Sequence, residues 1–140
     1  MTTAEFFIRL IEALLAGLII GFERQWHHKE TGLKTNMLVA TGAAAFVLLS
    51  IKVAEDSPNI DVTRITAQVV MGVGFLGAGV IFREGPNVHG LNSAATIWCS
   101  AAIGCIAASG YFVEALICTF LVTIVNIVLE PVEKWMKNRK

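Results

Sequence analysis

The sequence has 140 residues, enough for one domain, of which 55% are hydrophobic and only 16% are charged. A soluble domain usually has about 25% charged residues, so this composition excludes an ordinary water-exposed surface. The formal net charge is zero, and the absence of a basic run argues against nucleic acid as a partner.

Five apolar segments follow one another along the chain. Each has about 17–19 residues, and at about 1.5 Å per residue a helix of that length approaches the ~30 Å hydrocarbon core of a bilayer. No segment alternates polar and apolar residues, which favours helices over a β-barrel. The sequence therefore predicts an all-α polytopic membrane bundle of about five transmembrane helices with Gly/Ala-rich packing. The segments are residues 6–22, 35–51, 65–82, 93–109 and 111–129.

The first segment contains charges that oppose insertion into lipid. A charge at the helix centre costs about 2.5–3.5 kcal/mol, whereas a Leu, Ile or Phe gains only about 0.3–0.6 kcal/mol. Glu5, Arg9 and Glu12 are spaced i, i+4 and i+7, so they share one helix face and can pair. We therefore expect this helix to span the membrane with its charged face towards protein.

The loop after the first segment carries the most suggestive charged residues. Glu23, His27 and Glu30 are spaced i, i+4 and i+7, beside Arg24 and Lys29. Three interpretations are open: a solvated loop with ordinary ion pairs, a structural network, and a metal site formed by Glu23, His27 and Glu30. Mg²⁺ would suit the metal site, because it prefers oxygen ligands.

The third segment contains "GVGFLGAGV", whose first six residues match G-x-G-x-x-G. A dinucleotide site needs a strand before this motif and an acid about 20 residues later, but residues 85–113 contain no Asp or Glu. Small residues instead let membrane helices approach closely, so Gly72, Gly74, Gly77 and Gly79 predict helix packing. A local break in this helix, with carbonyl groups exposed to a cation, is the alternative.

The loop between the third and fourth segments contains Arg83 and Glu84 at the expected membrane edge. Gly85 and Pro86 follow and favour a turn. Arg83 and Glu84 are either anchors or a proton-sensitive pair.

Several polar residues lie at the ends of the apolar segments or within them. Asn92 or Ser93 can cap the fourth helix, with Thr96 near its first turn. Gln68 and Asn126 can form hydrogen bonds between helices. We therefore treat Gln68, Asn92 and Thr96 as candidate functional residues.

Lys and Arg are unevenly distributed between the two sides that five spans would create. Eight of the 11 lie on the side of the C-terminus, so the positive-inside rule predicts an external N-terminus and a cytoplasmic C-terminus. Trp26 and Trp135 fit interfacial anchors, and Pro131 is expected to end the last helix. The eight are Arg24, Lys29, Lys34, Arg83, Lys134, Lys137, Arg139 and Lys140.

The sequence offers no sign of catalysis. Cys99, Cys105 and Cys118 lie in apolar segments, which favours buried thiols over disulfides. No nucleophile elbow, P-loop or H-E-x-x-H motif occurs, so we do not expect an enzyme. No positive region precedes the first apolar segment, so we expect no cleaved signal peptide.

Two long stretches, "GFERQWHHKETGLKTNMLVATGAA" and "AQVVMGVGFLGAGVIFREGPNVHGLNSAATIWCSAAIG", closely resemble the MgtC/SapB family of bacterial inner-membrane proteins. The resemblance extends from about residue 14 to residue 129. His89 stands where the family usually has arginine, and Lys34 replaces the arginine of the usual "GLRT". Members usually continue into a cytoplasmic C-terminal domain. We expect residues 1–140 to form the transmembrane domain alone.

The resemblance implies a role in growth at low magnesium and in virulence, through survival inside macrophages. It implies a regulator whose partners are membrane lipid, the membrane subunits of F-type ATP synthase and a small hydrophobic regulatory peptide. We expect no cofactor, with Mg²⁺ as the only candidate ion. Matched to the family, Glu84 and Asn92 are the first positions to test. The alternatives are a homo-oligomeric transporter or channel for Mg²⁺ or another small solute, and a cytoplasmic cation or acid sensor.

Overall fold

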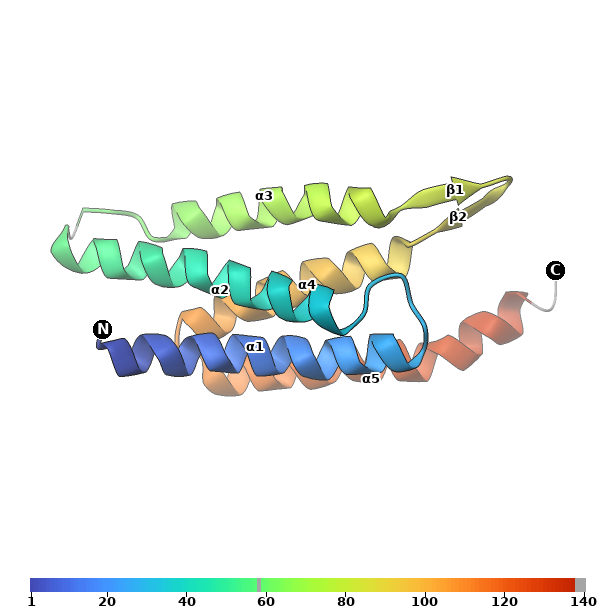
Figure 1. The fold of residues 1–140 in the computed structure, drawn as a ribbon, viewed down its shortest axis with the longest axis horizontal. Helices are drawn as coiled ribbons and strands as arrows, with labels where there is room; N and C mark the ends of the chain where they lie inside the picture. The colour runs from blue at the N-terminus through green and yellow to red at the C-terminus, as the bar shows by residue number, and fades with distance from the viewer. Residues whose placement is uncertain (58, 138–140) are drawn as a thin grey trace.

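The computed structural model describes residues 1–57 and 59–137. Within them, five long helices run alternately in opposite directions, and a short β-hairpin joins the third helix to the fourth (Figure 1). This architecture confirms the predicted all-α bundle. The elements are α1 Thr3–Trp26, α2 Leu33–Asp56, α3 Thr63–Val80, β1 Phe82–Glu84, β2 Asn87–His89, α4 Leu91–Ala108 and α5 Phe112–Lys137.

Four of the described helices are long and apolar enough to cross a membrane: α2, α3, α4 and the Phe112–Val132 part of α5. Helix α1 is as long as α2, at 24 residues, but it carries more charge. It lies alongside the other helices over most of its length (Figure 1). A transmembrane position for α1 therefore remains a prediction.

The charged face of α1 makes different contacts from those expected. Glu5 forms a capping box with Thr2: each side chain accepts a hydrogen bond from the other residue's backbone N–H, at 2.7 and 3.1 Å. Arg9 donates to the carbonyl oxygen of Ala108, at the end of α4, at 2.9 Å. Among the described residues no ion pair joins Glu5, Arg9 and Glu12, so the predicted pairing is wrong. Helix ends leave backbone groups without partners, and those groups recruit Glu5 and Arg9.

Helix α3 ends two residues earlier than predicted, because its chain continues into the hairpin. Phe82 pairs with His89 in the antiparallel ladder, and the predicted turn forms at Gly85 and Pro86. Gly90, the N-cap residue of α4, has φ of 83°, and a Cβ on it would overlap the carbonyl oxygen of Val80. Asn92 and Ser93 do not cap α4, so that prediction is wrong. The close approach to α3 requires glycine at this position.

Helices α2 and α4 cross in close contact. A Cβ on Gly104 would overlap the backbone carbonyl of Ala40 and lie only 2.9 Å from its carbon atom. Alanine side chains fill the surrounding core, including the fully buried Ala44 and Ala108. Small residues also bring α1 against α2, because a Cβ on Gly17 or Gly21 would lie 2.8 Å from a backbone Cα of α2. Small residues thus bring the helices together, as expected, at both crossings of α2.

The glycine-rich stretch of α3 has a different environment. A Cβ on Gly77 would lie 3.6 Å from the Cβ of Ala94, which is ordinary contact with α4. Cβ atoms on Gly72, Gly74 and Gly79 would meet nothing within 4 Å in the described chain. Within the described chain, Gly77 therefore contacts a neighbouring helix and the other three glycines do not. Helix α3 is unbroken through this stretch.

Helix α5 continues through Pro131 to Lys137, so the predicted end at proline is wrong. Proline removes one backbone hydrogen bond and clashes with the preceding turn, which usually bends a helix. The last part of α5 does turn away from the bundle (Figure 1).

The α1–α2 loop, the β-hairpin and the C-terminal part of α5 lie at the same end of the bundle, here called the hairpin end (Figure 1). The other two connections lie at the opposite end. This alternation groups the described Lys- and Arg-rich segments on one side, as predicted, while Arg139 and Lys140 lie outside the described residues. The exposed Trp26 is at the hairpin end.

Candidate functional site

The last turn of α1 buries two charged residues at the hairpin end. Glu23 is 6% exposed and Arg24 is 1% exposed. Helix α1 continues past Phe22 to Trp26, and this extension carries both side chains into the protein. The solvated-loop interpretation is therefore wrong for Glu23 and Arg24. Charges are rarely buried without partners, so their contacts define the site.

Arg24 belongs to a hydrogen-bonded chain that connects α1, the α1–α2 loop and α4. Its Nη2 donates to Ser93 Oγ at 2.8 Å, and Ser93 Oγ donates to Glu30 Oε2 at 2.6 Å. The Ser93 hydrogen bond is the main cause that lowers the pKa of the Glu30 carboxyl below its ordinary value. The backbone N–H of Glu30 and the charges of Arg24 and Lys29 lower it further.

Replacing Ser93 with alanine should raise the pKa of Glu30 towards its ordinary value. In the wild type, the depressed pKa contributes stability above the unfolded value of about 4.3, and this contribution disappears as the pH falls through the folded pKa. A carboxyl ¹³C NMR titration in detergent micelles measures the change. Ser109→Ala is the matched control, because the Ser109 hydroxyl bonds within its own helix to the Cys105 carbonyl. An unchanged Glu30 titration in Ser93→Ala would contradict the contact.

A buried pair of polar residues also connects α2 to α4, farther from the hairpin end than Ser93. Ser100 Oγ donates to Asn36 Oδ1 at 2.9 Å, and Asn36 Nδ2 donates to the carbonyl oxygen of Gly32 at 2.9 Å. Sequence reasoning missed Asn36 and Ser100, and it gave Ser93 only a capping role. The spacing of Ser93, Thr96 and Ser100, at i, i+3 and i+7, was the available signal for one polar face on α4.

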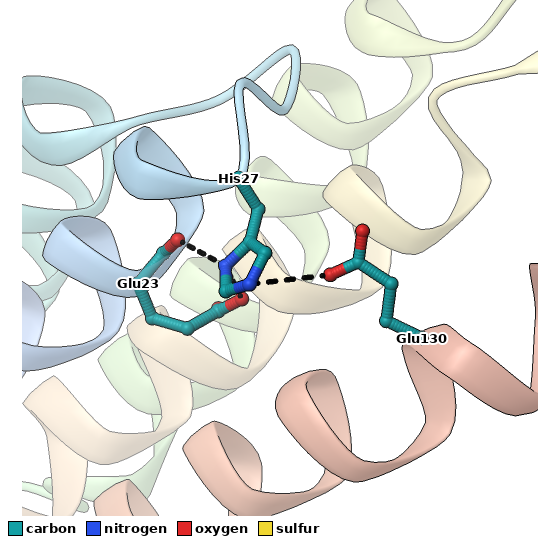
Figure 2. A group of neighbouring side chains, drawn as sticks. All are labelled: Glu23, His27 and Glu130. Atoms are coloured by element: carbon teal, nitrogen blue, oxygen red, sulfur yellow. Dashed lines mark hydrogen bonds and ion pairs between the residues drawn. The ribbon is translucent and has the colours of Figure 1, made fainter.

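Glu23, His27 and Glu130 form a second cluster, which joins α1 to α5 (Figure 2). His27 Nδ1 lies 3.1 Å from Glu23 Oε1, and His27 Nε2 lies 3.5 Å from Glu130 Oε2. Lys29 Nζ donates to the other oxygen of Glu130 at 3.1 Å. The three candidate ligand atoms lie within 4.8 Å of one another, so this group can hold a metal ion.

This cluster corrects the metal site predicted from the sequence. Helix α1 ends at Trp26, so Glu30 leaves the shared face and bonds to Ser93. Glu130 takes the third position. It lies about 100 residues later in the chain, and helical spacing alone has no means of finding such a partner.

The family model of the MgtC family matches residues 10–135. This chain belongs to the MgtC family. Protein MgtC of Salmonella typhimurium is 53% identical over 124 residues, which cover 89% of this chain and 52% of that protein. Protein MgtC of Brucella abortus is 52% identical over 122 residues, covering 87% and 50%. The chain thus spans about half the length of these curated relatives. No solved structure matches it.

In this MgtC-family chain, Arg83 and Glu84 lie outside the buried clusters. Both are exposed on the hairpin. Arg83 Nε donates to the Gly85 carbonyl at 2.9 Å, and Glu84 Oε2 lies 3.9 Å from His89 Nε2. The contacts that the structure gives them lie within the hairpin.

Asn92, Thr96 and Asn126 lie together in a mainly apolar cleft of about 270 Å³ between α4 and α5. Thr96 Oγ1 donates within its helix to the Asn92 carbonyl at 2.9 Å. Asn126 is buried, yet its Nδ2 has no acceptor among the described residues. The predicted hydrogen bond from the Asn126 amide to another helix is therefore not formed within the described chain.

Gln68 lies apart from the other candidate functional residues of this chain. It is exposed on α3 and lines an apolar cleft of about 470 Å³ between α2 and α3. The structure thus brings together Glu23, Arg24 and Lys29 at the hairpin end. Asn92 and the hairpin residue His89 line a cleft of about 370 Å³ there together with Arg24 and Lys29. Gln68 lies elsewhere, on α3.

Proposed function

We propose that this chain is the membrane domain of a non-enzymatic MgtC-type regulator in the bacterial inner membrane. In this proposal it supports growth at low Mg²⁺ and survival inside macrophages by modulating another membrane complex. Membership of the MgtC family and the name of the curated relatives support the general assignment. The proposed orientation, with the N-terminus outside, puts the hairpin end in the cytoplasm.

The observation that carries the regulatory proposal is the uneven distribution of buried polar groups. The contacts of Arg24, Glu23 and Asn36 all lie towards the hairpin end of α1 and α2. The middle of the bundle is filled by apolar side chains such as Leu48 and Ile103, each at most 2% exposed. The described core of one copy therefore favours a sealed interior over an ion path, and the exposed Arg83 and Glu84 leave charged groups at the hairpin end for recognition by a partner.

The membrane subunits of F-type ATP synthase are the proposed partner, and a small hydrophobic regulatory peptide is a second. Helix α3 suits such contacts, because Val73 and Gly77 are the residues that it buries within the described chain. Its exposed face, which includes Phe75 and Met71, is available for lipid or for another membrane helix.

Crosslinking in native membranes tests the regulatory proposal. A photoreactive residue at the exposed Glu84 and another at the exposed Phe75 should give crosslinks to subunits of a different membrane complex, identified by mass spectrometry. The same residue at the fully buried Ser100 is the control and should give none. Crosslinks only between copies of the chain would instead favour a homo-oligomer.

Flux measurements separate regulation from direct transport. The purified protein in liposomes should move neither Mg²⁺ nor protons faster than protein-free liposomes. Selective flux that is lost in Glu84→Ala would overturn the regulatory proposal and favour transport by an oligomer. This outcome would also require a second copy to complete a polar path.

A further inference from the structure

Glu23 presents a buried carboxylate whose contacts do not explain its burial. Its side chain is 5% exposed, and neither carboxylate oxygen accepts a hydrogen bond within the described part of the chain. A carboxylate removed from water is unfavourable unless a cation or hydrogen-bond donors replace the lost hydration. The neighbouring group that it faces is the imidazole of His27 (Figure 2).

The backbone determines which nitrogen of His27 is available to a ligand. Nδ1 lies 3.0 Å from the carbonyl oxygen of Glu23, one helical turn earlier, and an Nδ1–H donates to that oxygen. In this tautomer Nε2 carries the lone pair and faces Glu130 Oε2 at 3.5 Å. Metal-binding histidines characteristically donate their other ring N–H to a carbonyl or carboxylate oxygen in this way.

We propose that Glu23, His27 and Glu130 bind one divalent transition-metal ion of the zinc class and thereby join α1 to α5. The candidate ligand atoms, one from each residue, are within 4.8 Å of one another. Bonds of about 2.0–2.2 Å to Zn²⁺ bring ligand atoms within this separation. Two carboxylates also neutralise the charge of a divalent ion.

The ligand set favours zinc over magnesium. Imidazole nitrogen suits Zn²⁺ and other late first-row ions, whereas Mg²⁺ prefers oxygen ligands and retains several waters. Three protein ligands and one water make a tetrahedral site that zinc adopts readily. Lys29 holds the second oxygen of Glu130 at 3.1 Å and so orients this carboxylate towards the other two ligands.

The site joins segments that are distant in the sequence. Glu130 directly precedes Pro131, which lies inside α5, and the last part of this helix turns away from the bundle (Figure 1). A metal ion at this position fixes Glu130 of α5 against the end of α1. The position of the last part of α5, which we predict to be cytoplasmic, therefore depends on whether the ion is bound.

Zinc titration of the purified full chain in detergent micelles tests the proposal, with a chromophoric chelator as competitor. We expect one Zn²⁺ per chain, retained in the presence of a hundredfold excess of Mg²⁺. His27→Gln and Glu130→Gln should each weaken binding at least tenfold. His28→Asn and Glu114→Gln are the matched controls, because both residues are exposed and outside the cluster, and binding should not change.

Cobalt provides a readout that does not depend on the stability of the variants. Co²⁺ bound to the wild-type chain should give the visible absorption of a tetrahedral nitrogen and oxygen site, and Zn²⁺ should remove it. A thiolate-to-cobalt band would assign binding to a cysteine and overturn the proposal. Equal zinc affinity in wild type and His27→Gln, or binding of Mg²⁺ in preference to Zn²⁺, would also overturn it. These results do not depend on a partner complex, so they are independent of the proposed regulatory function.

Discussion

Replacing Arg24 with methionine is expected to lower the free energy of unfolding by about 2 kcal/mol. Methionine retains much of the buried volume, so the main loss is the charged hydrogen bond to Ser93 Oγ at 2.8 Å. Hydrogen bonds that involve a charged group contribute about 1.5–3 kcal/mol. Reversible unfolding in mixed micelles, followed by circular dichroism, measures the change.

Arg83→Met is the matched control for this prediction. Arg83 is exposed on the hairpin and donates locally to the Gly85 carbonyl, so its replacement should change stability by less than about 0.5 kcal/mol. A loss of similar size in both variants would show that the buried Arg24–Ser93 hydrogen bond stabilises the protein no more than the exposed contact of Arg83. The Arg24 variant should also raise the pKa of Glu30, since the positive charge of Arg24 is one cause that lowers it.

The apolar segments predicted the helices well, because the requirement to satisfy backbone groups in lipid leaves few alternatives to a helix. The predicted ends were less accurate. Phe82 belongs to a strand, since the chain after Val80 turns into a hairpin, and Pro131 lies within α5. Apolar character alone does not distinguish the end of a helix from an apolar strand that follows it.

The site was predicted only where its residues are close in sequence. Glu23, Arg24 and His27 lie within two turns of one helix, so their spacing indicated a shared region. Ser93 and Glu130 come from α4 and α5, and their positions depend on how the helices pack. Helical periodicity describes faces of single helices, and it does not say which faces meet.

The glycines illustrate the same limit. The glycine-rich motif of α3 predicted close packing, yet the glycines that lie against a neighbouring helix backbone are Gly17, Gly21 and Gly104. What determines the need for glycine is the distance to the neighbouring backbone, and a count of glycines along one helix does not contain that distance.

Gly104→Ala is expected to destabilise the protein by about 1–3 kcal/mol, because the added methyl group overlaps the Ala40 carbonyl. Backbone atoms of α2 have no rotamer change that relieves the overlap, so the helices must separate along their crossing. Gly72→Ala adds the same methyl group where nothing lies within 4 Å, and it should be neutral or stabilising by up to about 1 kcal/mol, since alanine is the better helix former. Unfolding of both variants in mixed micelles measures the contrast. Equal stability of the two would contradict the α2–α4 crossing, whereas a loss specific to Gly72→Ala would indicate a second chain packed on α3.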